Sequence, residues 1–124
     1  MPSELRYAKS HEWVCVEGEI AVVGITDCAQ DALGNIEFVE LPAKGTIVEQ
    51  NGEMALVEST KVACDVLAPI PGTVFQVNKA LERFPALINR APYTDGWLCR
   101  LKPFDPAGLA SLMTAEEYEA HIGR

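Results

Sequence analysis

The segment Glu53–Ala68, EMALVESTKVACDVLA, contains two runs rich in Val, Leu and Ala on either side of a short polar stretch. Apolar and polar side chains alternate in both runs, with Met54 and Leu56 on one face of the first, and this predicts two half-buried strands. Strands joined by a short polar stretch form a hairpin, although the Asn-Gly or Asp-Gly turn common in hairpins is absent. We therefore expect Lys61 at or near the hairpin tip with its amine in water, where Glu58 is the nearest acidic residue. A lysine in such a position is most often an ordinary solvated side chain.

A five-residue pattern flanks this hairpin on both sides. The chain has Pro-x-x-Gly-Thr at Pro42–Thr46 and again at Pro69–Thr73, and two apolar residues follow each copy. A pattern present only twice predicts two similar strand–turn–strand units, because a solenoid needs at least three repeats. A quasi-symmetric pair of small sheets with one lysine at a turn resembles the architecture of lipoyl and biotinyl carrier domains.

Composition and charge limit the class of protein. A chain of 124 residues with 48% hydrophobic and 23% charged residues predicts one soluble globular domain over residues 1–124. No apolar run approaches the roughly 18 residues of a membrane span, and Met1–Arg6 shows no targeting segment. The net charge of −8 argues against nucleic-acid and anionic-membrane partners, which need a basic surface. The same charge fits either docking onto basic patches of partner enzymes or plain solubility.

The cysteines and histidines predict neither a metal site nor a catalytic centre. The four cysteines share no C-x-x-C motif and no paired spacing: Cys15, Cys28, Cys64 and Cys99. This scatter favours a reducing compartment over a disulfide or zinc framework. The two histidines, His11 and His121, are too few for a metal cluster, and no local Ser-His-Asp or Cys-His set is present.

The remaining pattern predicts a β-rich core over about residues 7–102 and a helical segment over about 105–122. Runs with strand-like alternation lie at Trp13–Val16, Glu19–Ile25, Asn35–Glu40, Thr73–Asn78 and Trp97–Leu101. Short helices are expected at Asp27–Leu33 with Thr26 as N-cap, at Lys79–Arg83, from Asp105 to about Met113, and from the Thr114–Glu117 capping box to about His121. Residues 87–96 are rich in turn formers and are expected to form a loop.

Nine groups of residues, in order along the chain, match one known family. They are Tyr7 with Ser10–Trp13, Val23–Thr26 with Ala29 and Gln30, Leu33–Gly34, Phe38–Pro42, the V-E-S-x-K of Val57–Lys61, Ala68–Gly72, Val77–Asn78, Pro85 with Ile88 and Asn89, and Pro92–Tyr93 with Gly96–Trp97. On these residues the chain resembles the glycine cleavage system H proteins from about Leu5 to Tyr118. Any one group is weak, but nine in this order are specific.

The resemblance implies a fold and a role. The fold is mainly β with short helices, a barrel-sandwich hybrid with the lysine at a hairpin tip and helices at the C-terminus. The implied cofactor is lipoate, attached to Lys61 by a lipoate–protein ligase or a lipoyl/octanoyl transferase. The carrier would take an aminomethyl group from a pyridoxal-phosphate glycine decarboxylase to a tetrahydrofolate-dependent aminomethyltransferase, and a dihydrolipoamide dehydrogenase would reoxidise it. A non-catalytic carrier of this kind is expected to be a monomer.

The matched motifs also suggest site residues. Ser10, Glu12 and Asp65 are candidates for holding and protecting the loaded arm, since a cationic amine on a hydrolysable carbon needs carboxylates, hydroxyls and shielding from water. Glu58 and Ser59 are candidates for recognition by the ligase. The alternative for the first three is that Ser10 caps a turn while Glu12 and Asp65 face solvent.

Several positions depart from what the family leads us to expect. Thr60 and Val62 flank the lysine where Val and Ala are commoner, and Cys64 stands where Ser is usual. A thiol three residues from Lys61 could exchange with a dithiolane, but we favour Cys64 as a small buried side chain that fills a core gap. Trp13 is expected in the core, and His11 is expected as a hydrogen-bonded edge residue.

Other functions remain open at this point. A biotinyl carrier is set aside because Thr60 and Val62, not Met, flank Lys61. An H-like protein that relays lipoyl groups to other acceptors, or serves redox signalling, would need the same exposed lysine. An interaction module with an unmodified Lys61 is the alternative from another class. The expected location is the bacterial cytoplasm, or the mitochondrial matrix if a transit peptide has been removed.

Overall fold

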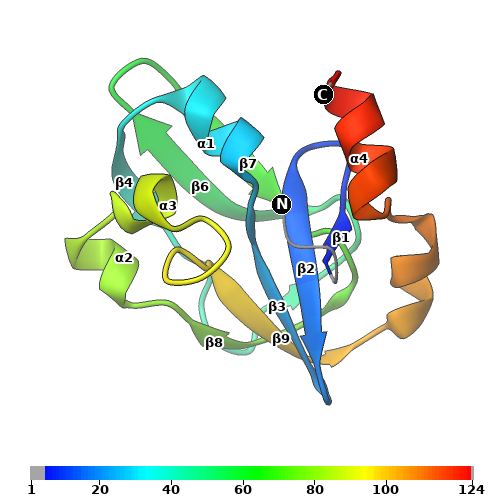
Figure 1. Ribbon diagram of the computed structural model, residues 1–124. Coiled ribbons are helices and arrows are strands. Elements are labelled where there is room, and N and C mark those ends of the chain that lie inside the picture. The colour runs from blue at the N-terminus through cyan, green and yellow to red at the C-terminus, as the bar shows by residue number, and fades with distance from the viewer. Residues whose placement is uncertain (1–4, 124) are drawn as a thin grey trace.

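The structure is a computed structural model that describes residues 5–123, so part of the Met1–Arg6 stretch lies outside the described residues. The fold is mainly β with short helices around two sheets (Figure 1). The first sheet has the order β1-β2-β3-β9-β8-β5 and the second has the order β4-β6-β7. The strands are β1 (Arg6–Tyr7), β2 (Glu12–Glu17), β3 (Ile20–Ile25), β4 (Ile36–Glu40), β5 (Ile47–Val48), β6 (Glu53–Ser59), β7 (Ala63–Leu67), β8 (Gly72–Val77) and β9 (Cys99–Phe104). The helices are α1 (Asp27–Leu33), α2 (Ala80–Arg83), α3 (Leu87–Arg90), the 3-10 helix η1 (Pro106–Ser111) and α4 (Ala115–Ile122).

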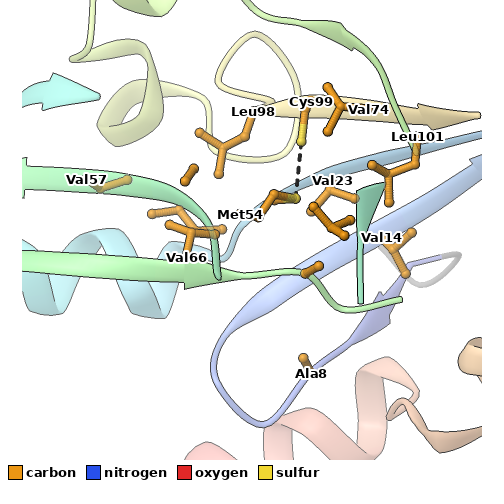
Figure 2. Packing of buried hydrophobic residues seen from close by; sticks show 14 of the residues in the cluster. Ala8, Val14, Val23, Met54, Val57, Val66, Val74, Leu98, Cys99 and Leu101 are labelled. Carbon is orange, nitrogen blue, oxygen red and sulfur yellow. Dashed lines mark hydrogen bonds between the residues drawn. The ribbon is translucent and has the colours of Figure 1, made fainter. Parts of the chain in front are cut away.

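The two sheets bury their apolar faces against each other. Figure 2 shows β6 and β7 contributing Val57 and Val66 to a core that strands β3, β8 and β9 complete with Val23, Val74, Cys99 and Leu101, together with Leu98 just before β9. Met54 lies between the sheets, where its sulfur accepts from the Cys99 thiol at 3.3 Å. This shared core fixes the β6–β7 hairpin on the rest of the molecule.

The two Pro-x-x-Gly-Thr copies meet in the first sheet. Strand β5 directly follows the first copy and β8 begins within the second, and they pair antiparallel with Ile47 opposite Thr73 and Val48 opposite Gly72. The chain therefore uses the repeated pattern to join its two halves.

Helix boundaries follow the capping residues that the sequence shows. Thr26 accepts from the Ala29 N–H and begins α1. Thr114 and Glu117 form the expected capping box of α4, which Gly123 in the left-handed region caps at the C-terminal end. No helix within residues 5–123 is both long and apolar enough to cross a membrane.

Four expectations about elements were wrong. Residues 87–96 contain the helix α3, which is too short for a periodic signal. The segment after Asp105 forms a helix capped by Asp105 as expected, the 3-10 helix η1, but it ends at Ser111 and not near Met113. The last strand is β9, which runs to Phe104 because Phe104 still pairs with Gly72. Finally, Met54 and Leu56 do not share a face, because a bulge between Glu53 and Ala55 shifts the register and buries Met54.

Candidate functional site

Lys61 lies at the tip of the hairpin formed by β6 and β7, as expected. The strands pair up to Glu58 opposite Ala63. The Ser59 hydroxyl closes the turn by accepting hydrogen bonds from the backbone N–H groups of Lys61 and Val62, both at 3.2 Å. This side-chain turn replaces the Asn-Gly signal that the sequence lacks. Lys61 is exposed and, within residues 5–123, takes part in no ion pair, so its amine fits covalent attachment of a carboxylic acid.

Asn89 supports the base of this tip from α3. Its amide oxygen accepts from the Ile36 N–H at 2.9 Å, and its amide nitrogen donates to the Gly34 carbonyl at 2.8 Å and to the Gln30 side chain at 2.9 Å. The adjacent Asn35 carbonyl accepts from the hairpin-tip backbone at 3.3 Å. One side chain therefore ties α1, the start of β4 and, through Asn35, the lysine turn into one unit.

Glu12 is the only acidic side chain buried among residues 5–123, with 2% of its surface exposed. One carboxylate oxygen accepts from the Ser10 hydroxyl, and the other accepts from the Leu67 N–H at 3.1 Å. Burial raises the pKa of Glu12, although both donors act in the opposite direction. Glu12 thus connects the beginning of β2 to the end of β7, and the alternative in which it faces solvent is wrong.

Asp65 lies apart from Ser10. The exposed Asp65 lines an outer cleft of about 320 Å³ together with Glu40 and Glu53. Ser10 lines a different cleft of about 380 Å³, next to Leu67. The structure therefore brings Ser10 and Glu12 together and leaves Asp65 on a neighbouring surface of β7.

Cys64 is the residue before Asp65 on β7. Its side chain is exposed, so the expectation of a buried gap-filling thiol was wrong. Partial burial and then the nearby charges of Glu12 and Asp65 raise the pKa of the thiol. Cys64 is therefore within electrostatic reach of both carboxylates, and its thiolate form is disfavoured.

Comparison with known proteins identifies this arrangement. The model of the glycine cleavage H-proteins matches residues 5–124. The chain belongs to the glycine cleavage H-protein family. Among its H-protein relatives, the one from Alcanivorax borkumensis is 48% identical over 122 residues, covering 98% of this chain and 95% of that protein. The one from Thermus thermophilus is 49% identical over 119 residues, covering 96% of this chain and 93% of that protein.

A solved structure agrees with the fold. The crystal structure of a glycine cleavage system H protein from Mycobacterium marinum is 36% identical and superimposes with a TM-score of 0.91 over the whole of both chains. The resemblance read from the nine motifs and the barrel-sandwich-like fold are thereby confirmed. Membership of the H-protein family supports a role as a lipoyl carrier component of the glycine cleavage system.

Two further sequence expectations concern residues beside Glu12. Trp13 is in the core as expected, where its indole N–H donates to the carbonyls of Ile25 and Pro92, both at 3.0 Å. His11 is hydrogen-bonded as expected, with its Nδ1 atom 2.7 Å from the Tyr118 hydroxyl. Sequence reasoning gave no role to Tyr118, because its contact with His11 joins residues 107 positions apart.

The other candidates lie close to the lysine. Glu58 is half-buried in β6, opposite Ala63 and Phe38, and Ser59 forms the turn itself. Both therefore belong to the same hairpin as Lys61. Within the described part of the chain, no three His, Cys, Asp or Glu side chains are placed to hold a metal ion.

Proposed function

We propose that this chain carries lipoate on Lys61 and serves the glycine cleavage system as its shuttle. The observation that carries the proposal is the exposed lysine at the tip of a hairpin whose turn is closed by Ser59. A ligase can reach such a tip, and the anchored strands keep the attachment point fixed relative to the surface where an arm would rest. Amide formation would also remove the lysine charge.

When attached, lipoate supplies a flexible dithiolane arm that can carry an aminomethyl group between enzymes. The proposed partners are the glycine decarboxylase, the aminomethyltransferase and the dihydrolipoamide dehydrogenase. The chain itself contributes the attachment point, a surface on which the arm rests, and Glu58 and Ser59 as the features that a ligase or transferase would recognise. The relatives named above are bacterial, which supports a bacterial cytoplasmic location, and we propose a monomer.

Ser10 and Glu12 are proposed to hold the loaded arm. An aminomethyl group on sulfur carries a cationic amine, and a carboxylate already fixed by two donors can accept from it without reorganising. A cation beside Glu12 would also offset the effect of burial on its ionised form. Asp65, in the neighbouring cleft, is proposed as a secondary contact along β7.

The first experiment is an intact-mass measurement after incubation with a lipoate–protein ligase, lipoate and ATP. We expect a single lipoyl increment on the Lys61 peptide and none on a Lys61→Arg variant. If several ligases and transferases leave the mass unchanged, the carrier proposal is wrong, and an interaction module takes its place.

A second assay separates the shuttle from the alternative, a relay that hands lipoyl groups to other acceptors. The lipoylated chain is mixed with glycine decarboxylase and glycine, and the release of carbon dioxide is followed. Turnover that depends on the carrier supports the shuttle. Lipoyl transfer to other acceptors without such turnover would favour the relay.

A further inference from the structure

The hydroxyl of Tyr118 lies at the centre of a buried polar contact on α4. Its oxygen is 2.7 Å from His11 Nδ1 and 2.8 Å from Thr26 Oγ1. The Tyr118 side chain is fully buried, and its ring stacks on Tyr7 with centroids 4.8 Å apart. One hydroxyl thus connects the last helix to the residue before Glu12 and to the N-cap of α1.

The direction of these hydrogen bonds follows from the Thr26 hydroxyl. Thr26 Oγ1 already accepts from the Ala29 N–H at 3.2 Å, so its own proton is available to Tyr118. Tyr118 can then donate its proton to His11 Nδ1. This direction gives each hydroxyl proton an acceptor, and it assigns the His11 proton to Nε2.

The turn that these bonds hold is strained. His11 has a φ of 75°, in the left-handed region that residues other than glycine seldom adopt. Its backbone is fixed by bonds from the His11 N–H to the Ala8 carbonyl at 3.0 Å and from the Thr26 N–H to the His11 carbonyl at 3.0 Å. His121, also on α4, places Nε2 3.3 Å from the Lys9 carbonyl. Helix α4 therefore contacts the β1–β2 turn at two points, beside β1 (Figure 1).

We propose that Tyr118 and His11 are positioning residues, through which α4 sets the place of Ser10 and Glu12 against the end of β7. This inference rests on the proposed role of Glu12 in holding the loaded arm. The C-terminal helix α4 would then help to position the residues that bind the arm. Removal of the Tyr118 hydroxyl leaves the backbone bonds of the turn but takes away the side-chain bond that holds His11. The Glu12 carboxylate is then less firmly held in the orientation that the Leu67 N–H defines.

The test uses the lipoylated protein, reduced and loaded with formaldehyde and ammonium, and follows the loss of the aminomethyl mass with time. Tyr118→Phe keeps the ring and removes the hydroxyl, and we expect the loaded arm to hydrolyse about 3- to 10-fold faster, the loss that one hydrogen bond produces. Thr26→Val should act similarly, whereas Thr26→Ser should retain the slow rate. Nitrogen NMR of His11 should show the Nε2–H tautomer in the parent and a mixture in Tyr118→Phe.

Thr114→Ala is the matched control, because it weakens the cap of α4 and leaves both contacts of the Tyr118 hydroxyl intact. Equal acceleration in Thr114→Ala and Tyr118→Phe would mean that only helix stability matters and would overturn the inference. The inference is also overturned if the accelerations caused by Tyr118→Phe and Glu12→Gln multiply in the double variant. A residue that acts through Glu12 should cause little further acceleration once Glu12 has been replaced. Acceleration by Glu12→Gln without any by Tyr118→Phe overturns the positioning role and leaves the proposed function intact. No acceleration by Glu12→Gln refutes both roles.

Discussion

Replacement of Asn89 by Ala tests whether one side chain holds the base of the lysine hairpin. The substitution removes three hydrogen bonds of 2.8–2.9 Å, two of them to the backbone groups of Gly34 and Ile36. At about 1 kcal/mol for each bond, the sum is about 3 kcal/mol. Because Asn89 is half-buried and water can replace part of this bonding, we expect a loss of about 2–3 kcal/mol. For a chain of this size, that corresponds to a fall in Tm of about 10 °C.

The measurement is urea unfolding followed by tryptophan fluorescence, with hydrogen exchange of the Ile36 amide as a local readout. Gln30→Ala is the matched control, since it deletes only one of the three bonds of Asn89, together with the Gln30 bond to the Asp27 carbonyl, and should cost about 1–2 kcal/mol. A loss below about 1 kcal/mol for Asn89→Ala, or equal losses in the two variants, would refute the reasoning. Unchanged exchange at Ile36 would refute it as well.

Three further outcomes are expected. In Gly24→Ala the new Cβ would lie 2.6 Å from the Trp13 ring, which two hydrogen bonds hold in place, so we expect destabilisation by about 1–3 kcal/mol in chemical denaturation; an unchanged midpoint would show that the ring can move. Burial and then His121 lower the pKa of His11 below 6.5. The unfolded chain therefore binds the extra proton first, and the unfolding free energy should fall as the pH drops below about 6.5. This pH dependence of the unfolding free energy should weaken in His11→Asn, because asparagine tolerates the left-handed backbone but does not titrate. An identical pH profile in that variant would show that His11 is not the titrating group. A thiol reagent applied to the native protein should modify the exposed Cys64 well before Cys99, whose burial raises its pKa to about 12; peptide mass mapping that finds Cys99 modified first would exclude this order.

The parts of the fold that were predictable depend on local chemistry. The two hairpin strands follow from alternation, and α1 and α4 begin where Thr26 and Thr114 cap them. The exposure of Lys61 follows from the polar stretch around it. These features are set by residues within a few positions of one another, so one sequence is enough to find them.

The features that were missed depend on contacts between distant segments. The bulge beside Ala55 reverses the faces of Met54 and Leu56, and no local signal marks it. Cys64 was expected inside, but the edge strand β7 leaves it exposed. Asp65 and Ser10 were named together as candidates, yet they line different clefts, because Asp65 is on β7 and Ser10 is in the turn between β1 and β2.

The residues around Glu12 show why a site of this kind resists prediction from pattern. A glutamate at the start of a strand predicts an exposed side chain, but here it is buried, and burial opposes its ionised form. The residue before it has a strained backbone that a hydroxyl on the last helix helps to hold. Burial of a carboxylate and a left-handed histidine each cost stability, so neither is expected from folding alone. Their presence in adjacent positions, where the end of β7 meets the start of β2, is what the proposed binding of a cationic group would use.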